Sequence, residues 1–167
     1  WFLPQGLSAS APLRAGSVLS GTTGVLDQRR GEYRLQLTEK LVVHEAPRPA
    51  QLPAVPGNLR VASLNMHNLF NGDGHGGGFP TERGATTREE YERQVEKLVT
   101  VIQAMHPDIA VMMEVENDGS GPDSTLVQLV GELNQAGPVR DYRWIDTGDK
   151  LGNDAIHVAM IYRGGAV

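Results

Sequence analysis

The sequence predicts a mixed protein in which a β-rich segment precedes a layered α/β or α+β domain. Residues 13–44 carry strand-like runs, whereas residues after 58 alternate between strands and amphipathic helices. Residues 45–58 contain four prolines and little periodicity, which is typical of an extended linker. We therefore expect a β-rich module over residues 1–45, a proline-rich linker over 46–58 and a second domain over 59–167.

The β-rich module is predicted from three runs of strand-forming residues. These runs are Ser17–Leu26, Tyr33–Leu37 and Leu41–His44. Asp27 to Gly31 is expected to form the hairpin loop between the first two runs.

The second domain is predicted to begin with a strand over Leu59–Leu64 and a helix after Thr87. Thr87 and Glu90 have the spacing of a capping box, in which each side chain satisfies the other residue's backbone amide. Apolar residues then recur at spacings of four, three, four and three, which predicts an amphipathic helix that Pro107 ends. This stripe consists of Tyr91, Val95, Leu98, Ile102 and Met105.

The remaining elements continue the alternation. Asp108–Asn117 begins as a nearly continuous apolar run, which predicts a strand that is covered on both faces. A second helix is expected from about Asp123 to Ala136, with Gly137 as its stop signal. Tyr142–Asp146 and Ile156–Arg163 are expected to be further strands.

Composition limits the classes of function. The formal net charge is -5, which argues against a broad basic face for nucleic acid and suggests that a phosphate substrate would need a metal cation. Cysteine is absent, which excludes disulfides, thiolate metal sites and cysteine nucleophiles. No apolar run approaches the ~20 residues of a membrane-spanning helix, so we expect no membrane span.

The ends of the sequence suggest a longer parent. The chain starts at Trp1 rather than Met and stops at Val167, just after a strand-like run. We expect an excised or processed piece, with any targeting segment outside it.

Polar side chains follow two strands of the predicted domain. Asn65 comes directly after the first strand, and Glu114 lies near the end of the next. If the intervening helix is a crossover, the two strands are parallel and both side chains emerge at the same edge of the sheet, where α/β proteins bind ligands. A carboxylate and an amide oxygen suit Mg²⁺ or Ca²⁺. The alternative is structural: Asn65 caps a turn and Glu114 pairs with a surface lysine or arginine.

The glycine-rich segment between Asn71 and Phe79 permits several readings. "HGGGF" is similar to the oxyanion-hole glycines of lipases, but no Gly-x-Ser-x-Gly elbow accompanies it. "NGDGHGGGF" is similar to one turn of a calcium-binding repeat, which binds only when it stacks on further copies. We favour a flexible loop bordering a cleft, from which Asp73 could touch a metal. His106 is expected at a solvated helix end, and His157 is expected to be a packed or edge residue of a strand.

Three segments together resemble a known family. "LRVASLNMHNLF", "DIAVMMEVEN" and "NDAIHVAMIYR" resemble, in order and spacing, the first half of the endonuclease/exonuclease/phosphatase superfamily, which is deoxyribonuclease-like. "NLFNGDGHGGGFPTERGAT" and "ENDGSGPDSTLVQLVGELN" are closer to its bacterial extracellular nucleases, in which an OB-like module precedes the nuclease domain. The resemblance implies an α+β fold, a layered α/β/β/α-type sandwich of which this chain is the N-terminal half, after a small OB-like segment.

The resemblance also implies a site. Glu114 matches the metal-binding glutamate of the family, and Asn65 matches the asparagine that contacts metal or phosphate. His67 and Asp154 match positions that approach the substrate in relatives. The implied cofactor is Mg²⁺, with Ca²⁺ or Mn²⁺ as alternatives. The family completes its site with histidines, paired acids and an Asp-x-Asn segment from a second half that this sequence lacks.

The function implied by the resemblance is metal-dependent hydrolysis of phosphodiesters in DNA, with RNA left open as a further substrate, by an extracellular, periplasmic or cell-surface nuclease. We expect this fragment to bind metal weakly and to show little or no catalysis. Two alternatives stay open: a phosphatase or phospholipase-like diesterase of the same superfamily, and a non-catalytic binding module.

Overall fold

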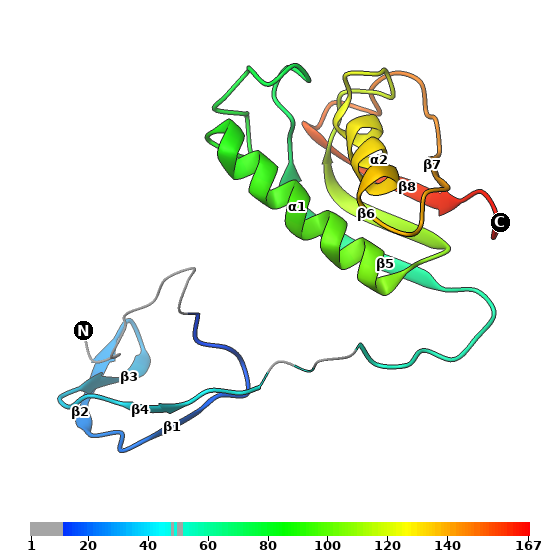
Figure 1. Cartoon of the computed structure of the whole chain (residues 1–167). Helices are drawn as coiled ribbons and strands as arrows, with labels where there is room; N and C mark the ends of the chain where they lie inside the picture. Colours follow the sequence, from blue (N-terminus) through cyan, green and yellow to red (C-terminus); the bar gives the residue numbers. More distant parts are fainter. Residues whose placement is uncertain (1–11, 48, 50–51) are drawn as a thin grey trace. The chain divides into compact units, whose positions relative to one another are not determined.

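The structure is a computed structural model that describes residues 12–47, 49 and 52–167 (Figure 1). The chain divides into two compact units, Trp1–Gln51 and Leu52–Val167. It contains both helices and strands, as the sequence predicted. Residues 1–11 of the expected β-rich module, and residues 48, 50 and 51 of the expected linker, lie outside the described residues.

The first unit contains two small antiparallel pairs. β1 (Val18–Ser20) pairs with β4 (Val42–His44), and β2 (Gly24–Arg29) pairs with β3 (Glu32–Leu37). Arg30 and Gly31 have φ values of 53° and 83°, the positive pair that a tight hairpin turn between two strands requires. The hairpin predicted around Asp27–Gly31 is therefore present, and the single run Ser17–Leu26 is split between β1 and β2.

The second unit contains a four-stranded mixed sheet in the order β5-β6-β8-β7. β5 (Val61–Leu69) and β6 (Ile109–Glu116) are parallel, and α1 (Arg88–Met105) connects them as a crossover. β8 (Ile156–Arg163) is antiparallel to β6, and the short edge strand β7 (Tyr142–Trp144) is antiparallel to β8. α2 (Thr125–Ala136) lies between β6 and β7 in the sequence.

The helix caps explain where α1 and α2 begin. The hydroxyl of Thr87 accepts a hydrogen bond from Glu90 N at 3.3 Å. The Glu90 carboxylate accepts from the amide of Thr86 at 2.8 Å rather than from Thr87, so the predicted box is shifted by one residue. Ser124 caps α2, and its hydroxyl accepts from Val127 N. α2 therefore begins two residues later than the expected Asp123.

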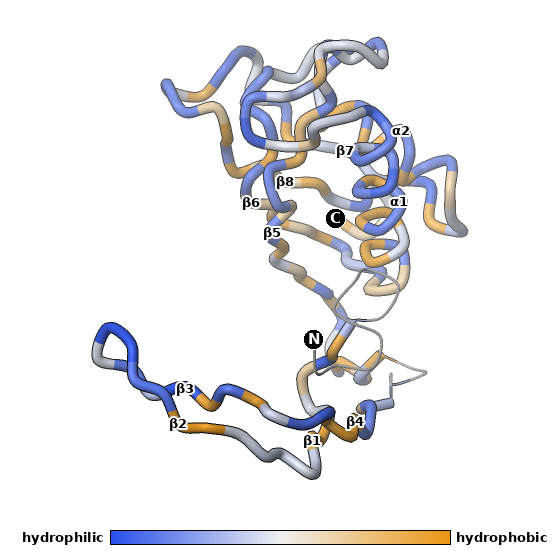
Figure 2. Tube along the Cα trace, turned by 90° about the vertical axis from the view of Figure 1, so that its left-hand side faces the viewer, coloured by the Kyte–Doolittle hydropathy of each residue, from blue (hydrophilic) through white to orange (hydrophobic). Residues whose placement is uncertain are grey.

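Both helices cover the same face of the sheet, as the two perpendicular views show (Figures 1 and 2). The core lies between them and the inward side chains of β5, β6 and β8. Its fully buried members include Met66, Ile102, Met112, Leu129, Leu133 and Ile161. Removing such a side chain leaves a cavity and costs roughly 2–5 kcal/mol, so these residues dominate the stability of the unit.

The opposite face of this sheet carries apolar side chains that are exposed. Val61, Val158 and Met160 retain 61%, 59% and 39% of their accessible surface. β6 was expected to be covered on both faces, but in this structure only the helix side of the sheet is covered by described residues.

Two predicted strand ends are wrong. β5 does not end at Leu64 but continues through a bulge to Leu69, because Met66 and Leu69 return to the core after the polar residues. β7 ends at Trp144 rather than Asp146, whose carboxylate instead accepts from the amide of Gly148 in the following loop. No helix among the described residues is long and apolar enough to cross a membrane.

Candidate functional site

The ends of the parallel strands β5 and β6 are irregular at the same level of the sheet. Pairing runs in register as far as Asn65 and Met113 and resumes at Leu69 and Val115. Met66, His67 and Asn68 on β5 therefore lie opposite the single residue Glu114 on β6. A bulge of this kind turns side chains out of the regular alternation of a strand, and bulges are frequent next to active sites.

Three non-glycine residues in the irregular parts of β5 and β6 have a left-handed backbone. The φ values are 55° for His67, 51° for Asn68 and 61° for Glu114. Each such residue costs of order 1–3 kcal/mol and persists only when its surroundings enforce it. Strain of this kind concentrates at functional sites, which makes the bulge the strongest structural candidate for one.

The Glu114 carboxylate is held from two sides. Asn65 Nδ2 donates to Glu114 Oε1 at 2.6 Å, and Asn68 N donates to Glu114 Oε2 at 3.1 Å. The structure thus brings the two principal predicted site residues, Asn65 and Glu114, into direct contact across 49 positions of sequence. Because each carboxylate oxygen can accept more than one bond, both retain acceptor capacity.

The orientation of the Asn65 amide is fixed by its second contact. Asn65 Oδ1 accepts from the backbone amide of His67 at 2.7 Å, so only its NH₂ group can face Glu114. In this arrangement Asn65 orients the carboxylate and does not direct its own oxygen to the same point. This differs from the prediction that Asn65 and Glu114 contribute oxygen ligands together.

α1 supports the bulge from the helix side. Gln94 Nε2 donates to Met66 O at 2.8 Å and to His67 O at 3.0 Å. These carbonyls belong to the irregular part of β5, where ladder partners are interrupted. Gln94 was not predicted to support the site. Its only signal in the sequence is that a polar residue lies on the apolar side of α1.

The donor set fits a divalent cation only in part. Glu114 is a single, partly buried carboxylate, and no group of three histidine, aspartate or glutamate side chains that could hold a metal lies within residues 12–47, 49 and 52–167. Mg²⁺ is commonly held by one or two carboxylates together with waters and substrate phosphate. The residues present fit that mode and not a closed protein cage.

The two weaker site predictions lie near this edge but do not join the cluster. His67 contributes its backbone amide to Asn65, and its exposed side chain lines a groove beside α1. Asp154 forms an ion pair with Arg83 at 2.8 Å, and both side chains are largely exposed. No hydrogen bond or ion pair joins either of the two side chains to Glu114 within the described part of the chain.

A buried polar network fixes the segment that follows each bulge. Glu116 Oε2 accepts from Thr125 Oγ1 at 2.7 Å and from Asn71 N at 3.1 Å, and Asp118 Oδ2 accepts from Thr125 N at 2.8 Å. Burial raises the pKa of both Glu116 and Asp118. These bonds tie the segment that follows β5, and the end of β6, to the start of α2.

The glycine-rich loop is hydrogen-bonded internally. Asp73 Oδ1 accepts from His75 N at 2.8 Å and Gly77 N at 2.9 Å, and these backbone bonds lower the pKa of the Asp73 carboxyl. Gly72 has a φ of 79°, and a Cβ there would lie 2.1 Å from Gly77 O, so the turn requires glycine. Asp73 is therefore committed to the loop, and no contact joins it to Glu114 among the described residues.

Comparisons with known proteins add no family assignment. Neither protein-family models, nor curated proteins, nor solved structures gave a match to this chain.

Proposed function

We propose that this chain contributes the metal-binding edge of a metal-dependent phosphodiesterase that hydrolyses nucleic acid. The observation that carries the proposal is the Glu114 carboxylate, oriented by Asn65 and Asn68 at the bulged ends of two parallel strands. Carboxyl ends of parallel strands are the usual ligand position of open α/β sheets. The resemblance of the same strands to the endonuclease/exonuclease/phosphatase superfamily supports the reaction class.

In this proposal Glu114 is the protein ligand of a divalent cation, Mg²⁺ or a related ion. When bound, such an ion neutralises charge on a phosphate oxygen and acts as a Lewis acid. Asn65 and Asn68 hold the carboxylate in one orientation, and the Gln94 contacts hold the bulge that presents it. Preorganised groups of this kind need no rearrangement when charge develops on the substrate.

We also propose that the sheet of the second unit is one half of a two-sheet sandwich. The exposed apolar side chains of Val61, Val158 and Met160 support this, since a half-covered sheet of this composition normally packs against another layer. The OB-like identity of the first unit rests on the sequence resemblance; its small antiparallel pairs are compatible with a β-rich module.

The proposal predicts a single weak cation site that depends on Glu114. Mn²⁺ binding, measured by electron paramagnetic resonance of the free ion, should weaken at least tenfold in Glu114→Gln, because a neutral amide replaces the one charged ligand. Glu96→Gln removes the same charge from an exposed position on α1 and should bind as the unchanged protein does. Equal binding by Glu114→Gln and the unchanged chain would remove Glu114 from the site.

Activity is tested in a polypeptide that also carries the remaining residues of the proposed site. There, Glu114→Gln should abolish Mg²⁺-dependent cleavage of plasmid DNA while its circular dichroism stays unchanged. Unimpaired cleavage would favour the binding-module alternative for this part of the chain.

A further inference from the structure

A groove of about 500 Å³ runs beside α1 and adjoins the bulge that carries the candidate site. It is lined on one side by α1 and on the other by Met66, His67 and the segment 83–85. Gln94 lies on its wall and donates to the carbonyls of Met66 and His67, so the groove is continuous with the backbone that positions Glu114.

The charge of this groove is opposite to that of the chain. Arg83, Arg93 and Lys97 line it, and the only carboxylate in the lining is Glu90. The Glu90 carboxylate already accepts a hydrogen bond from the amide of Thr86. The chain as a whole, in contrast to this groove, has a net charge of -5. Three cations around one groove of an acidic protein form a local positive potential, which attracts anions.

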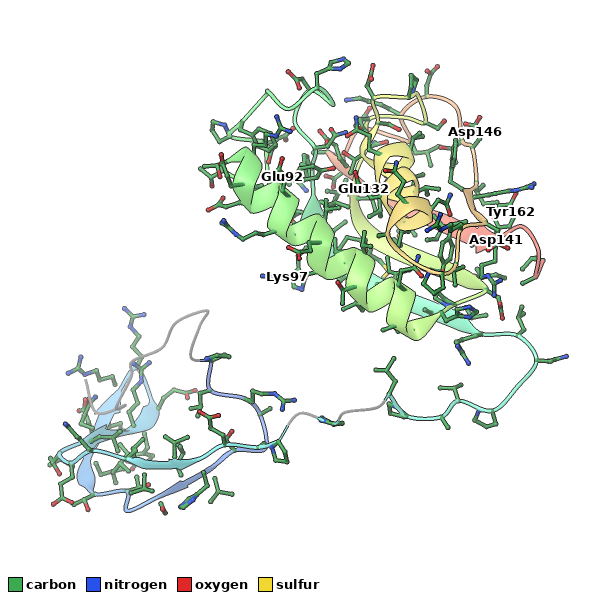
Figure 3. All side chains as sticks on the ribbon, in the orientation of Figure 1. Glu92, Lys97, Glu132, Asp141, Asp146 and Tyr162 are labelled. Carbon is green, nitrogen blue, oxygen red and sulfur yellow. The ribbon has the colours of Figure 1, made fainter. Side chains whose placement is uncertain are left out.

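Two of these cations form no ion pair with the residues that the structure describes, although Arg93 is near enough to Glu89 to contribute to the lowered pKa of that carboxyl. Arg83 pairs with Asp154, but neither Arg93 nor Lys97 lies within ion-pair distance of any acidic side chain in the described part of the chain. Arg93 and Lys97 are four residues apart on α1 and therefore about 6 Å apart along its axis, on one face of the helix. In Figure 3, Lys97 lies on the side of α1 that is turned away from α2.

We propose that this groove, lined by Arg83, Arg93, Lys97 and His67, binds the phosphodiester backbone of a nucleic-acid strand beyond the phosphate at Glu114. The inference rests on the proposed function, since it treats Glu114 as the point where one phosphate of the same strand is held. Three cations that line one groove suit a polyanion with regularly repeated charge better than an isolated phosphate. The groove would then set the direction in which the strand leaves the site.

The test measures binding of a fluorescent single-stranded DNA of about 12 nucleotides, a length within the span of known single-strand sites. Fluorescence anisotropy is recorded with the whole chain in EDTA, so that no cation contributes. Arg93→Gln combined with Lys97→Gln should weaken binding about 20-fold near 0.1 M salt, because two phosphate contacts are lost. The slope of log affinity against log salt should become shallower by about 1.4.

The matched control removes one arginine and one lysine elsewhere. Arg143→Gln combined with Lys150→Gln makes the same change in net charge on exposed residues of β7 and the following loop, and should alter affinity less than about twofold. If the two double variants weaken DNA binding equally, the groove is not the binding site and only the overall charge matters. That result would overturn the proposal. No measurable DNA binding by the unchanged chain would overturn it as well.

Two further experiments distinguish this proposal from an acidic protein partner and from the proposed metal site. A polyglutamate peptide of similar charge should bind much more weakly than the DNA; equal binding with equal loss in the Arg93 and Lys97 variant would indicate an acidic protein partner and contradict the nucleic-acid assignment. Glu114→Gln should retain DNA binding in EDTA. If Mn²⁺ binding fails to depend on Glu114 while the groove still binds DNA, the proposed function fails and the groove remains.

Discussion

The two grooves that flank α1 differ in charge although one helix lines both. The groove beside β5 contains Arg93 and Lys97. The crevice between α1 and α2 contains Glu92, Glu96 and Glu132, and only Glu92 among these pairs with an arginine of the lining, Arg88. Glu132 lies on α2 beside that crevice in Figure 3. The negative charge of Glu132 and Glu92 adds to burial in raising the pKa of Tyr91 there to about 12. The positive groove, and not the larger negative one, adjoins the Glu114 site.

This difference shows how an acidic protein can accommodate an anionic substrate. Over residues 92–97, α1 places Arg93 and Lys97 on one side and Glu92 and Glu96 on the other, since residues four apart share a face and neighbouring residues do not. The overall charge therefore says little about the surface next to the site. A net charge of -5 argues against a broad basic face on the protein, but it is compatible with a narrow basic groove.

The largest expected effect comes from reversing the charge of the positive groove. Arg93→Glu combined with Lys97→Glu should weaken single-stranded DNA binding more than about 100-fold at low salt, because repulsion replaces two phosphate contacts. Glu96→Lys combined with Glu132→Lys makes an opposite change in the negative crevice. That variant should strengthen binding only a few-fold, through long-range attraction. Similar magnitudes at the two grooves would erase the distinction between them.

The link between the positive groove and the bulge depends on Gln94. Gln94→Leu leaves the carbonyls of Met66 and His67 without their side-chain donor, which should lower the free energy of unfolding by about 2 kcal/mol. It should also weaken Mn²⁺ binding, since the strand that orients Glu114 loses its support. Urea denaturation and Mn²⁺ titration measure the two effects.

Gln135→Leu is the control for this prediction, because Gln135 is an exposed glutamine on α2 at the negative crevice. It should change stability by less than about 0.5 kcal/mol. If the Gln94→Leu protein is as stable as this control, the hydrogen bonds from Gln94 to Met66 and His67 contribute nothing to stability.

The left-handed backbone of Glu114 should make glycine more stabilising than alanine at this position, by about 1 kcal/mol in the free energy of unfolding. Because its φ is 61°, Glu114→Gly should be more stable than Glu114→Ala by roughly that amount. Glu116, two residues along β6, has no positive φ, and there glycine should be less stable than alanine. Thermal denaturation of the four variants compares them; the same order at both positions would contradict the strained bulge.

The smallest effect concerns His157, a half-buried residue of β8. Both of its ring nitrogens are buried without a hydrogen-bond partner among the described residues, and burial lowers its pKa below 6.5. Protonation therefore favours the unfolded state, so stability should fall as the pH drops through and below about 6.5. Nearby Asp118 opposes this shift, and its own raised pKa and that of Glu116 act in the other direction at lower pH.

His157→Phe should remove this sensitivity. The difference in unfolding free energy between about pH 7.5 and pH 5.5 should shrink by less than about 1.4 kcal/mol per pH unit, the limit for one titrating group. An unchanged pH dependence would show that His157 has the same pKa in the folded and unfolded states.

The regular parts of the second unit were predictable from periodicity. The α1 stripe, the buried run of β6 and the alternation of β8 each follow from apolar spacing, and the expected placement of Asn65 and Glu114 at one sheet edge follows from a crossover between parallel strands. The mixture of helices and strands, and the placement of Asn65 and Glu114 at one sheet edge, could be predicted without tertiary information.

The bulge itself was not predictable. Asn65, His67 and Asn68 interrupt the apolar alternation and are typical of a loop, whereas Met66 and Leu69 show their role only when they pack in the core. The left-handed backbone of Glu114 leaves no signal in the sequence, because glutamate rarely adopts it. Gln94 and the positive groove are equally hidden, since they depend on which face of α1 meets β5.

The most direct test of the central claim is the location of bound Mn²⁺. Paramagnetic broadening of backbone amide signals in the NMR spectrum maps where the ion lies. We expect the earliest broadening at the amides of Asn65, His67, Asn68 and Glu114, and its loss in Glu114→Gln. Broadening centred on Glu92, Glu96 and Glu132, unchanged in Glu114→Gln, would place the cation in the negative crevice and contradict a metal site at the bulged strand ends.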